Sequence, residues 1–193
     1  MGKIFAVMIF LLLTNTAAAQ DNPPEVDEGI SSIKKKTFDF STEARVFTDD
    51  ATAEFLLKYK NISLDWIRPD NDKDFLKLKV DREIFSLMGT GLDWNVALNG
   101  YNRRGESLGV LPSVGINLYM RIRPRLDVYV QFSGLTLGRR GHLSDFESGI
   151  KYFPQKNFSI SAGWRHVDFK LRRGGDNDKF VLSGVFTGVR YDF

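Results

Sequence analysis

The feature that most constrains this chain is an alternation of apolar and polar residues that runs, with short breaks, from Phe38 to Phe193. In residues 113–122 (SVGINLYMRI), every second residue is a large apolar one, and the residues between them are Ser, Gly, Asn, Tyr and Arg. Successive side chains of a β-strand point to opposite faces of the sheet, so a period of two predicts strands with one apolar and one polar face. The chain is therefore predicted to be all-β.

The number of strands depends on how the first part of this alternating region is divided. Segment 38–47 (FDFSTEARVF) also alternates, and Lys60-Asn61 offers a turn inside segment 53–66. If both features are used, the chain has ten strands; we adopt eight as the prediction and keep ten as the alternative. The eight predicted strands lie at residues 53–66, 74–82, 88–101, 112–122, 126–138, 144–152, 158–171 and 180–193.

Charges on the polar faces separate a membrane barrel from a soluble sandwich, which also alternates. Inside a barrel these charges are removed from water and need to pair with one another. Equal numbers of basic and acidic residues therefore predict a filled, ion-paired lumen and disfavour an open channel. Short turns such as Arg123-Pro124-Arg125 alternate with longer polar loops, as in outer-membrane barrels with periplasmic turns. We therefore predict a small antiparallel transmembrane β-barrel. The balancing charges are Lys77, Lys79, Arg121, Lys151, Arg165 and Arg190 against Asp81, Asp93, Asp127, Asp145, Glu147 and Asp192.

The first residues indicate export from the cytoplasm. Lys3 precedes an apolar run at residues 4–13, and Ala17-Ala18-Ala19 suits signal peptidase, so residues 1–19 are predicted to be a cleavable signal peptide. The apolar run is shorter than the ~20 residues that a membrane-spanning helix needs. Residues 20–37 are polar and are predicted to be a disordered periplasmic lead-in to a barrel over residues 38–193. The predicted location is the outer membrane of a Gram-negative envelope.

Composition excludes several other classes of protein. The chain has no cysteine, which excludes disulfides and lipid attachment at a cysteine. Its net charge of +3 is too small to suggest a nucleic-acid binder. With two histidines and no phosphate-binding or metallohydrolase motif, no metal site and no cofactor is expected. The function predicted is that of a monomeric, non-enzymatic envelope barrel, with a small channel as one alternative.

The last predicted strand carries a candidate assembly signal and, with the segment before it, a family resemblance. A terminal aromatic residue on an alternating strand, here Tyr191 and Phe193, resembles the signal read by the outer-membrane insertion machinery, which is a predicted partner. Residues 145–193 resemble the C-terminal third of a family of small, functionally uncharacterised outer-membrane β-barrel proteins. This resemblance implies fold and location but supplies no activity. The matching residues are Phe146, Glu147, Gly149, Tyr152, Gly163, Trp164, Arg165, Ser183, Gly184, Phe186, Gly188 and Phe193, with Val185 where the family pattern usually has proline.

Aromatic residues on the predicted strands are expected to form girdles at the two membrane interfaces, as they do in other outer-membrane barrels. The residues assigned to the girdles are Trp66, Trp94, Tyr101, Tyr152, Phe158, Trp164 and Tyr191.

One pair of residues is a candidate for catalysis. His142 and Ser144 share a face if they lie on a strand, so the imidazole can serve as a base for the hydroxyl. The spacing resembles the His-x-Ser of outer-membrane lipid A deacylases, which implies a lipid A esterase as the enzymatic alternative. Those enzymes have Arg before the His and Asn after the Ser, where this chain has Gly141 and Asp145. Glu147, the nearest following acid besides Asp145, is expected on the opposite face.

Three arginine pairs fall in segments predicted to be extracellular loops. Guanidinium groups bind phosphate bidentately, and lipopolysaccharide presents phosphates at this level of the membrane. These pairs are therefore the candidate lipopolysaccharide-binding residues, with outer-membrane lipid as the predicted partner. The pairs are Arg103-Arg104, Arg139-Arg140 and Arg172-Arg173.

Overall fold

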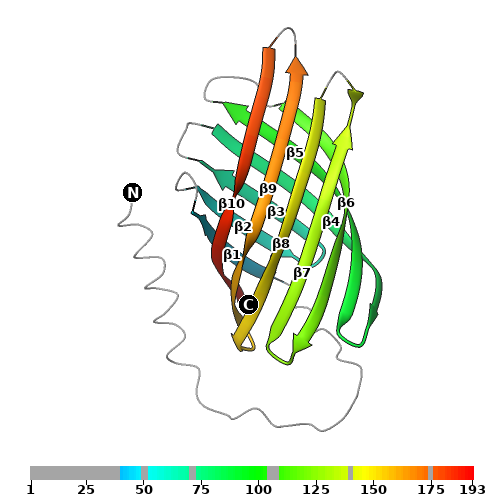
Figure 1. The fold of residues 1–193 in the computed structure, drawn as a ribbon, viewed down its shortest axis with the longest axis vertical. Coiled ribbons are helices and arrows are strands. Elements are labelled where there is room, and N and C mark those ends of the chain that lie inside the picture. Colours follow the sequence, from blue (N-terminus) through cyan, green and yellow to red (C-terminus); the bar gives the residue numbers. More distant parts are fainter. Residues whose placement is uncertain (1–39, 49–51, 70–72, 104–108, 139–140, 174–175) are drawn as a thin grey trace. The chain divides into compact units, whose positions relative to one another are not determined.

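The computed structural model describes residues 40–48, 52–69, 73–103, 109–138, 141–173 and 176–193, which form a closed antiparallel β-barrel (Figure 1). Each strand pairs with its neighbours in sequence, and the first pairs with the last to close the barrel. No helix among these residues is long and apolar enough to cross a membrane. The predicted signal peptide and lead-in lie outside the described residues. The strands are β1 (Phe40–Phe47), β2 (Ala53–Tyr59), β3 (Ile62–Arg68), β4 (Lys73–Leu87), β5 (Thr90–Arg103), β6 (Gly109–Arg123), β7 (Leu126–Thr136), β8 (Gly141–Gln155), β9 (Phe158–Arg173) and β10 (Asp176–Asp192).

The described residues thus contain ten strands. This is the alternative count that the sequence allows, and the preferred count of eight is wrong. Segment 38–47 supplies β1, which is part of the barrel wall between β10 and β2. Segment 53–66 folds back on itself at Lys60-Asn61, where Lys60 has a φ of 53°. Both β2 and β3 have seven residues, fewer than the ~9–11 expected of a membrane-crossing strand.

The connections at the two ends of the barrel differ. At one end, called here the turn end, strands are joined by the two-residue turns 60–61, 88–89, 124–125 and 156–157. The opposite end, called the loop end, carries the connections after β1, β3, β5, β7 and β9. Strands at this end run further than predicted: Lys170 of β9 pairs with Lys179 of β10, so most of the predicted loop 172–179 is strand. Tight turns at one end are confirmed, whereas the loops opposite are shorter than expected.

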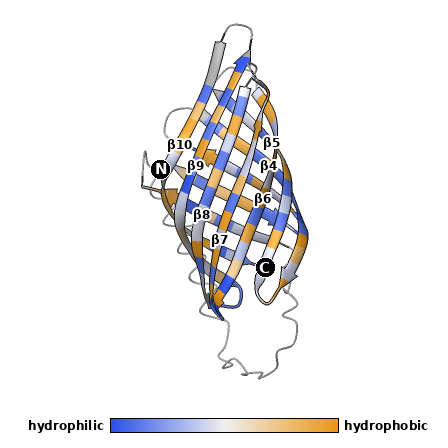
Figure 2. Ribbon diagram, turned by 45° about the vertical axis from the view of Figure 1, so that its right-hand side comes forward, coloured by the Kyte–Doolittle hydropathy of each residue, from blue (hydrophilic) through white to orange (hydrophobic). Residues whose placement is uncertain are grey.

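The two faces of the barrel wall have opposite chemistry, and Figure 2 shows hydrophobic and hydrophilic residues alternating along the strands. On the outer face of β6, Val114 and Ile116 are 57% and 52% exposed. The polar residues between such positions point inward, and many are buried. A soluble sandwich would bury the apolar face, so this arrangement defines a transmembrane barrel with its apolar surface toward lipid. Tyr101, which was predicted at the membrane interface, instead lies on the inner face with Asn99 and is buried.

Apolar side chains fill the loop end of the lumen. Phe75 of β4 stacks on Phe180 of β10, with ring centroids 5.1 Å apart, and on the edge of Phe169 of β9. These inward-facing residues form a single buried cluster, called here the apolar layer. Its members are Phe47, Ile67, Phe75, Tyr101, Leu111, Leu143, Val167, Phe169, Phe180, Leu182 and Phe186.

Candidate functional site

Below the apolar layer, ion pairs cross the lumen around Arg165 of β9. This side chain is fully buried, and its guanidinium donates to both oxygens of Asp145, Nε at 3.1 Å and Nη2 at 2.8 Å. It also pairs with Glu54 on β2. Asp145 in turn accepts a hydrogen bond of 2.7 Å from Lys77 Nζ, which comes from β4. Arg165 thus connects strands that lie on different sides of the lumen.

A second guanidinium, that of Arg45 on β1, extends the same set of contacts. Its Nε donates to Glu43 at 2.8 Å, and its Nη1 lies 2.9 Å from Glu147 and 3.2 Å from Glu54. We call the connected group the central ion network. It consists of Glu43, Arg45, Glu54, Asp65, Lys77, Asp145, Glu147 and Arg165, all of which are more than nine-tenths buried.

Glycine residues on the inner face make room for these large side chains. Gly188 of β10 pairs with Arg45, and a Cβ atom placed on it would lie 2.7 Å from Arg45 Cγ. A Cβ atom on Gly163 would lie 2.9 Å from the ring of Phe186, which itself packs under the Arg45 guanidinium at 4.6 Å. Larger residues at these two positions would push against the network and the apolar layer above it.

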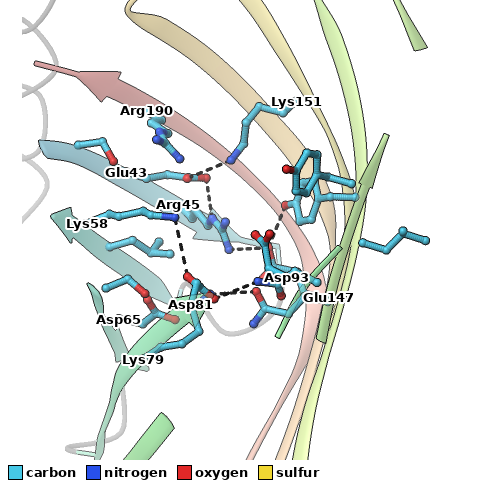
Figure 3. Close-up of a pocket in the computed structure, with 18 residues that line it drawn as sticks. Glu43, Arg45, Lys58, Asp65, Lys79, Asp81, Asp93, Glu147, Lys151 and Arg190 are labelled. Carbon is cyan, nitrogen blue, oxygen red and sulfur yellow. Dashed lines mark hydrogen bonds and ion pairs between the residues drawn. The ribbon is translucent and has the colours of Figure 1, made fainter. Parts of the chain in front are cut away.

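Between the central ion network and the turn end lies a polar cavity of about 160 Å³ (Figure 3). Side chains from both short and long strands line it, among them Ser41 and Ser63. Basic and acidic groups are present in equal numbers on its wall. They are Arg45, Lys58, Lys79, Lys151 and Arg190 against Glu43, Asp65, Asp81, Asp93 and Glu147. We call this space the turn-end cavity.

A separate polar group lies on the outer face of β8 and β9. His142 Nε2 is 3.1 Å from Asp168 Oδ2, and Lys170 Nζ donates to the same oxygen at 3.2 Å. Ser144 is the direct cross-strand partner of Asp168. His142 and Ser144 therefore share the outer face of a strand, while Glu147 is buried in the lumen, as the alternation predicts. We call His142, Ser144, Asp168 and Lys170 the outer-face cluster.

The candidate lipopolysaccharide-binding arginines are described in part. Arg103 ends β5, and Arg172 and Arg173 end β9, which places their backbones at the loop end of the barrel. Arg172 is exposed. Arg104, Arg139 and Arg140 lie outside the described residues.

The candidate assembly residues lie where β10 meets β1. Tyr191 and Phe193 pack edge to face at 4.9 Å, and the Phe193 ring also contacts Phe40 of β1 at 5.3 Å. The backbone N–H of Phe193 donates to the carbonyl oxygen of Phe40 at 3.0 Å. Phe193 itself is 61% exposed.

Sequence reasoning missed several residues of these sites. Asp168 was not connected with His142 because 26 residues separate them. Glu43 and Arg45 were omitted from the lumen because segment 38–47 was left out of the preferred barrel, and Glu54, in segment 53–66, was not assigned to a face. The signal that identifies them is the same alternation, since Arg45 and Glu54 each stand between two outward-facing apolar residues and Glu43 shares the face of Arg45. In the described part of the chain, no three His, Cys, Asp or Glu side chains are grouped so as to hold a metal ion.

Over the described residues, these features define the class of protein as a closed, ten-stranded antiparallel β-barrel with an apolar outer face. No family model matches the chain, and no curated protein matches it. Among solved structures it is similar to the NanC porin, with a TM-score of 0.47 and 9% sequence identity, covering 80% of this chain and 100% of the porin chain. We base no argument on a similarity of this level. The resemblance of residues 145–193 to uncharacterised outer-membrane barrels stays a prediction.

Proposed function

We propose that this chain is an outer-membrane barrel that does not conduct solutes and acts in the envelope through its surfaces. One observation carries the proposal: the lumen is filled at two successive levels, by the apolar layer and by the central ion network. A solute crossing the barrel would have to displace both. The amphipathic closed wall, apolar outside and polar inside, supports the outer membrane as the location.

Filling of the lumen is expected to be stable because the two levels differ in chemistry. The apolar layer contains stacked rings such as Phe75 and Phe180, which exclude water. The central ion network below it joins strands on different sides of the lumen through ion pairs. Opening the network would leave several buried charges without partners.

Conductance in planar bilayers tests this proposal. The purified wild-type protein is expected to give no sustained current steps. A variant with Phe75→Ala and Phe180→Ala opens space in the apolar layer only and is expected to remain closed, because the network is intact. Stable single-channel steps from the wild-type protein would contradict the proposal and favour the channel alternative.

Contact with lipopolysaccharide is the surface role that we propose first. Arg103, Arg172 and Arg173 end strands at the loop end, whereas Arg104, Arg139 and Arg140 lie outside the described residues. If the turns face the periplasm, these strand ends lie at the level of lipopolysaccharide phosphates, which guanidinium groups can bind bidentately. The insertion machinery, acting on Tyr191 and Phe193, is the proposed partner in assembly.

A second candidate function is hydrolysis of an ester in the outer leaflet, and the outer-face cluster favours it. A nucleophilic serine needs a base within reach and an acid that orients the base. Asp168 holds His142, and Ser144 adjoins Asp168 across the strands. Outward residues closer to the turn end, such as Ile150 and Ile160, are apolar and exposed. If the turns face the periplasm, the cluster lies toward the extracellular end of the apolar surface, near the level at which lipid A carries its acyl esters.

In this reaction Ser144 Oγ would attack the ester carbonyl while His142 takes the hydroxyl proton. His142 would then return that proton to the departing alcohol oxygen, leaving an acyl group on Ser144. Water, deprotonated by the same imidazole, would release the fatty acid and restore the serine. Asp168 would position the imidazole and stabilise its charged form.

Mass spectrometry of lipid A tests the hydrolase function. Lipid A from cells that make the wild-type protein would have one acyl chain fewer than lipid A from cells without it. This loss of an acyl chain would not occur with Ser144→Ala or His142→Ala. Ser148→Ala is the matched control, because Ser148 lies on the same face of β8 but pairs with Trp164 instead of an acid. Lipid A that is identical with and without the protein would exclude this activity.

A further inference from the structure

The turn-end cavity is a space inside the lumen that is closed on the side of the loop end. The central ion network bounds it toward the loop end, since Glu43, Arg45, Asp65 and Glu147 belong to both. Its volume of about 160 Å³ is close to that of an engineered protein cavity of ~150 Å³ that binds benzene. The cavity therefore has room for a molecule of about six to eight non-hydrogen atoms. Because the strands separate it from lipid, its ligand would be a free solute.

Buried oxygen atoms on the cavity wall lack hydrogen-bond partners in the part of the chain that the structure describes. They are Ser63 Oγ, Asp65 Oδ1 and Asn117 Oδ1. Ser63 is 5% exposed and Asp65 is 3% exposed. Carboxylate and amide oxygens only accept hydrogen bonds, and a buried acceptor without a donor is unfavourable. The groups that would satisfy this wall are ammonium or hydroxyl donors.

Two basic side chains, Lys151 and Arg190, lie on the more exposed part of the same wall, and Arg190 Nε donates to Asp192 Oδ1 at 2.7 Å. The side chains of Lys151 and Arg190 are 17% and 25% exposed, against 4% for Asp65 and 8% for Asp81. Lys151 Nζ lies 3.6 Å from Glu43, which is longer than a hydrogen bond, and 5.4 Å from the Tyr129 ring. In Figure 3, Arg190 and Lys151 lie at one side of the cavity, while Asp65 and Lys79 lie at the other.

We infer that the turn-end cavity binds a small zwitterion that carries an ammonium group and a carboxylate or phosphate. The ammonium group is placed against Ser63 and Asp65, where acceptors lack donors. The anionic group is placed against Lys151 and Arg190. The equal numbers of basic and acidic side chains on the wall suit a ligand with no net charge. This binding requires the lumen to be closed above the cavity, but it does not depend on lipopolysaccharide contact or on hydrolysis.

Isothermal titration of the full-length protein in detergent micelles tests this inference. The probes are γ-aminobutyrate and O-phosphoethanolamine, compared with butyrate, inorganic phosphate and ethanolamine, each of which carries one of the two charges. At least one zwitterion is expected to bind saturably and at least tenfold more tightly than its single-charge counterparts.

Two variants and two controls connect that binding to the cavity. Ser63→Ala removes a hydroxyl that has no hydrogen-bond partner in the described part of the chain, so the barrel should stay folded while affinity for the zwitterion falls about three- to tenfold. Lys151→Met should weaken binding at least tenfold. Ser159→Ala is the matched control, since the Ser159 hydroxyl is also buried without a hydrogen-bond partner among the described residues but does not line the cavity. Arg121→Met is the control for loss of a positive charge at the turn end outside the cavity.

The inference is overturned by three results. The first is that neither zwitterion binds at millimolar concentration to protein that shows the heat-modifiability of a folded barrel. The second is that Ser63→Ala and Lys151→Met bind as tightly as the wild-type protein. The third is that phosphate or butyrate binds as tightly as the zwitterions, which would mean an anion site without a place for the ammonium group.

Discussion

Replacing Arg165 with leucine is expected to remove much of the stability of the barrel. The guanidinium is fully buried, makes two hydrogen bonds to Asp145 and pairs with Glu54. Without it, the five buried carboxylates of the central ion network face only Arg45 and Lys77 inside that network. Removing one partner of a buried ion pair typically costs about 3–5 kcal/mol, because the remaining charge stays buried without compensation. Domains of this kind are stable by only about 5–15 kcal/mol, so a loss of this size is easily measured.

Reversible unfolding by guanidinium chloride in detergent micelles, followed by tryptophan fluorescence, measures this loss. Arg121→Leu is the matched control, because Arg121 pairs with Asp127 through a side chain that is 35% exposed. Its loss should cost about 0–1 kcal/mol, as for other exposed pairs. A cost below about half a kcal/mol for Arg165→Leu would refute the reasoning, since it would mean that the guanidinium is solvated in the folded barrel.

Three further predictions concern assembly and orientation. Deleting Phe193 removes the backbone hydrogen bond and ring contact to Phe40, so export should continue while outer-membrane levels fall; unchanged levels by fractionation would contradict an assembly role. Changing all six arginines of the three pairs to serine should leave a folded barrel whose affinity for lipopolysaccharide is lower and less dependent on salt, because salt screens exposed charges over ~8 Å; equal affinity and salt slope in a binding titration would argue against the contact. Trypsin added to intact cells should cut at Arg139 or Arg172 and spare Arg123 and Arg125, and the reverse pattern on sequencing the fragments would invert the assigned orientation.

Much of the fold follows from the period of two alone. The alternation assigns residues such as Lys77, Asp145 and Arg165 to one face, and the structure buries all three in the lumen. It also puts His142 and Ser144 on the outer face, apart from Glu147. These assignments need only the identity of the face, which a strand repeats every two residues without reference to the rest of the chain.

Contacts across the lumen and between strands could not be predicted in the same way. The partner of Arg165 on β2 is Glu54, which lies 111 residues away in the sequence, and Asp168 reaches His142 only through the register of β8 against β9. Register depends on turn geometry and on how the whole wall closes, which a single sequence does not specify. The charge balance indicated that ion pairs would form, but not which ones.

The residues that define the family resemblance acquire a physical role in the structure. Glu147 and Arg165 are members of the central ion network, 3.6 Å apart. Gly163 pairs across the strands with Gly149, and a Cβ on Gly163 would press against Phe186. The pattern therefore contains side chains of the network together with glycines that leave space for large inward-facing side chains.

The two ends of the lumen differ in the side chains that face inward. Eight strands predict a filled lumen from barrel diameter alone, but diameter grows with strand number, and ten strands enclose a wider space. This lumen is nevertheless filled toward the loop end, where inward positions hold Phe75, Phe169 and Phe180, and open toward the turn end, where they include Ser41 and Ser63. In this barrel the inward-facing side chains are apolar where the lumen is filled by stacked rings and mostly polar where it retains a cavity, so strand number alone does not set where the lumen is closed.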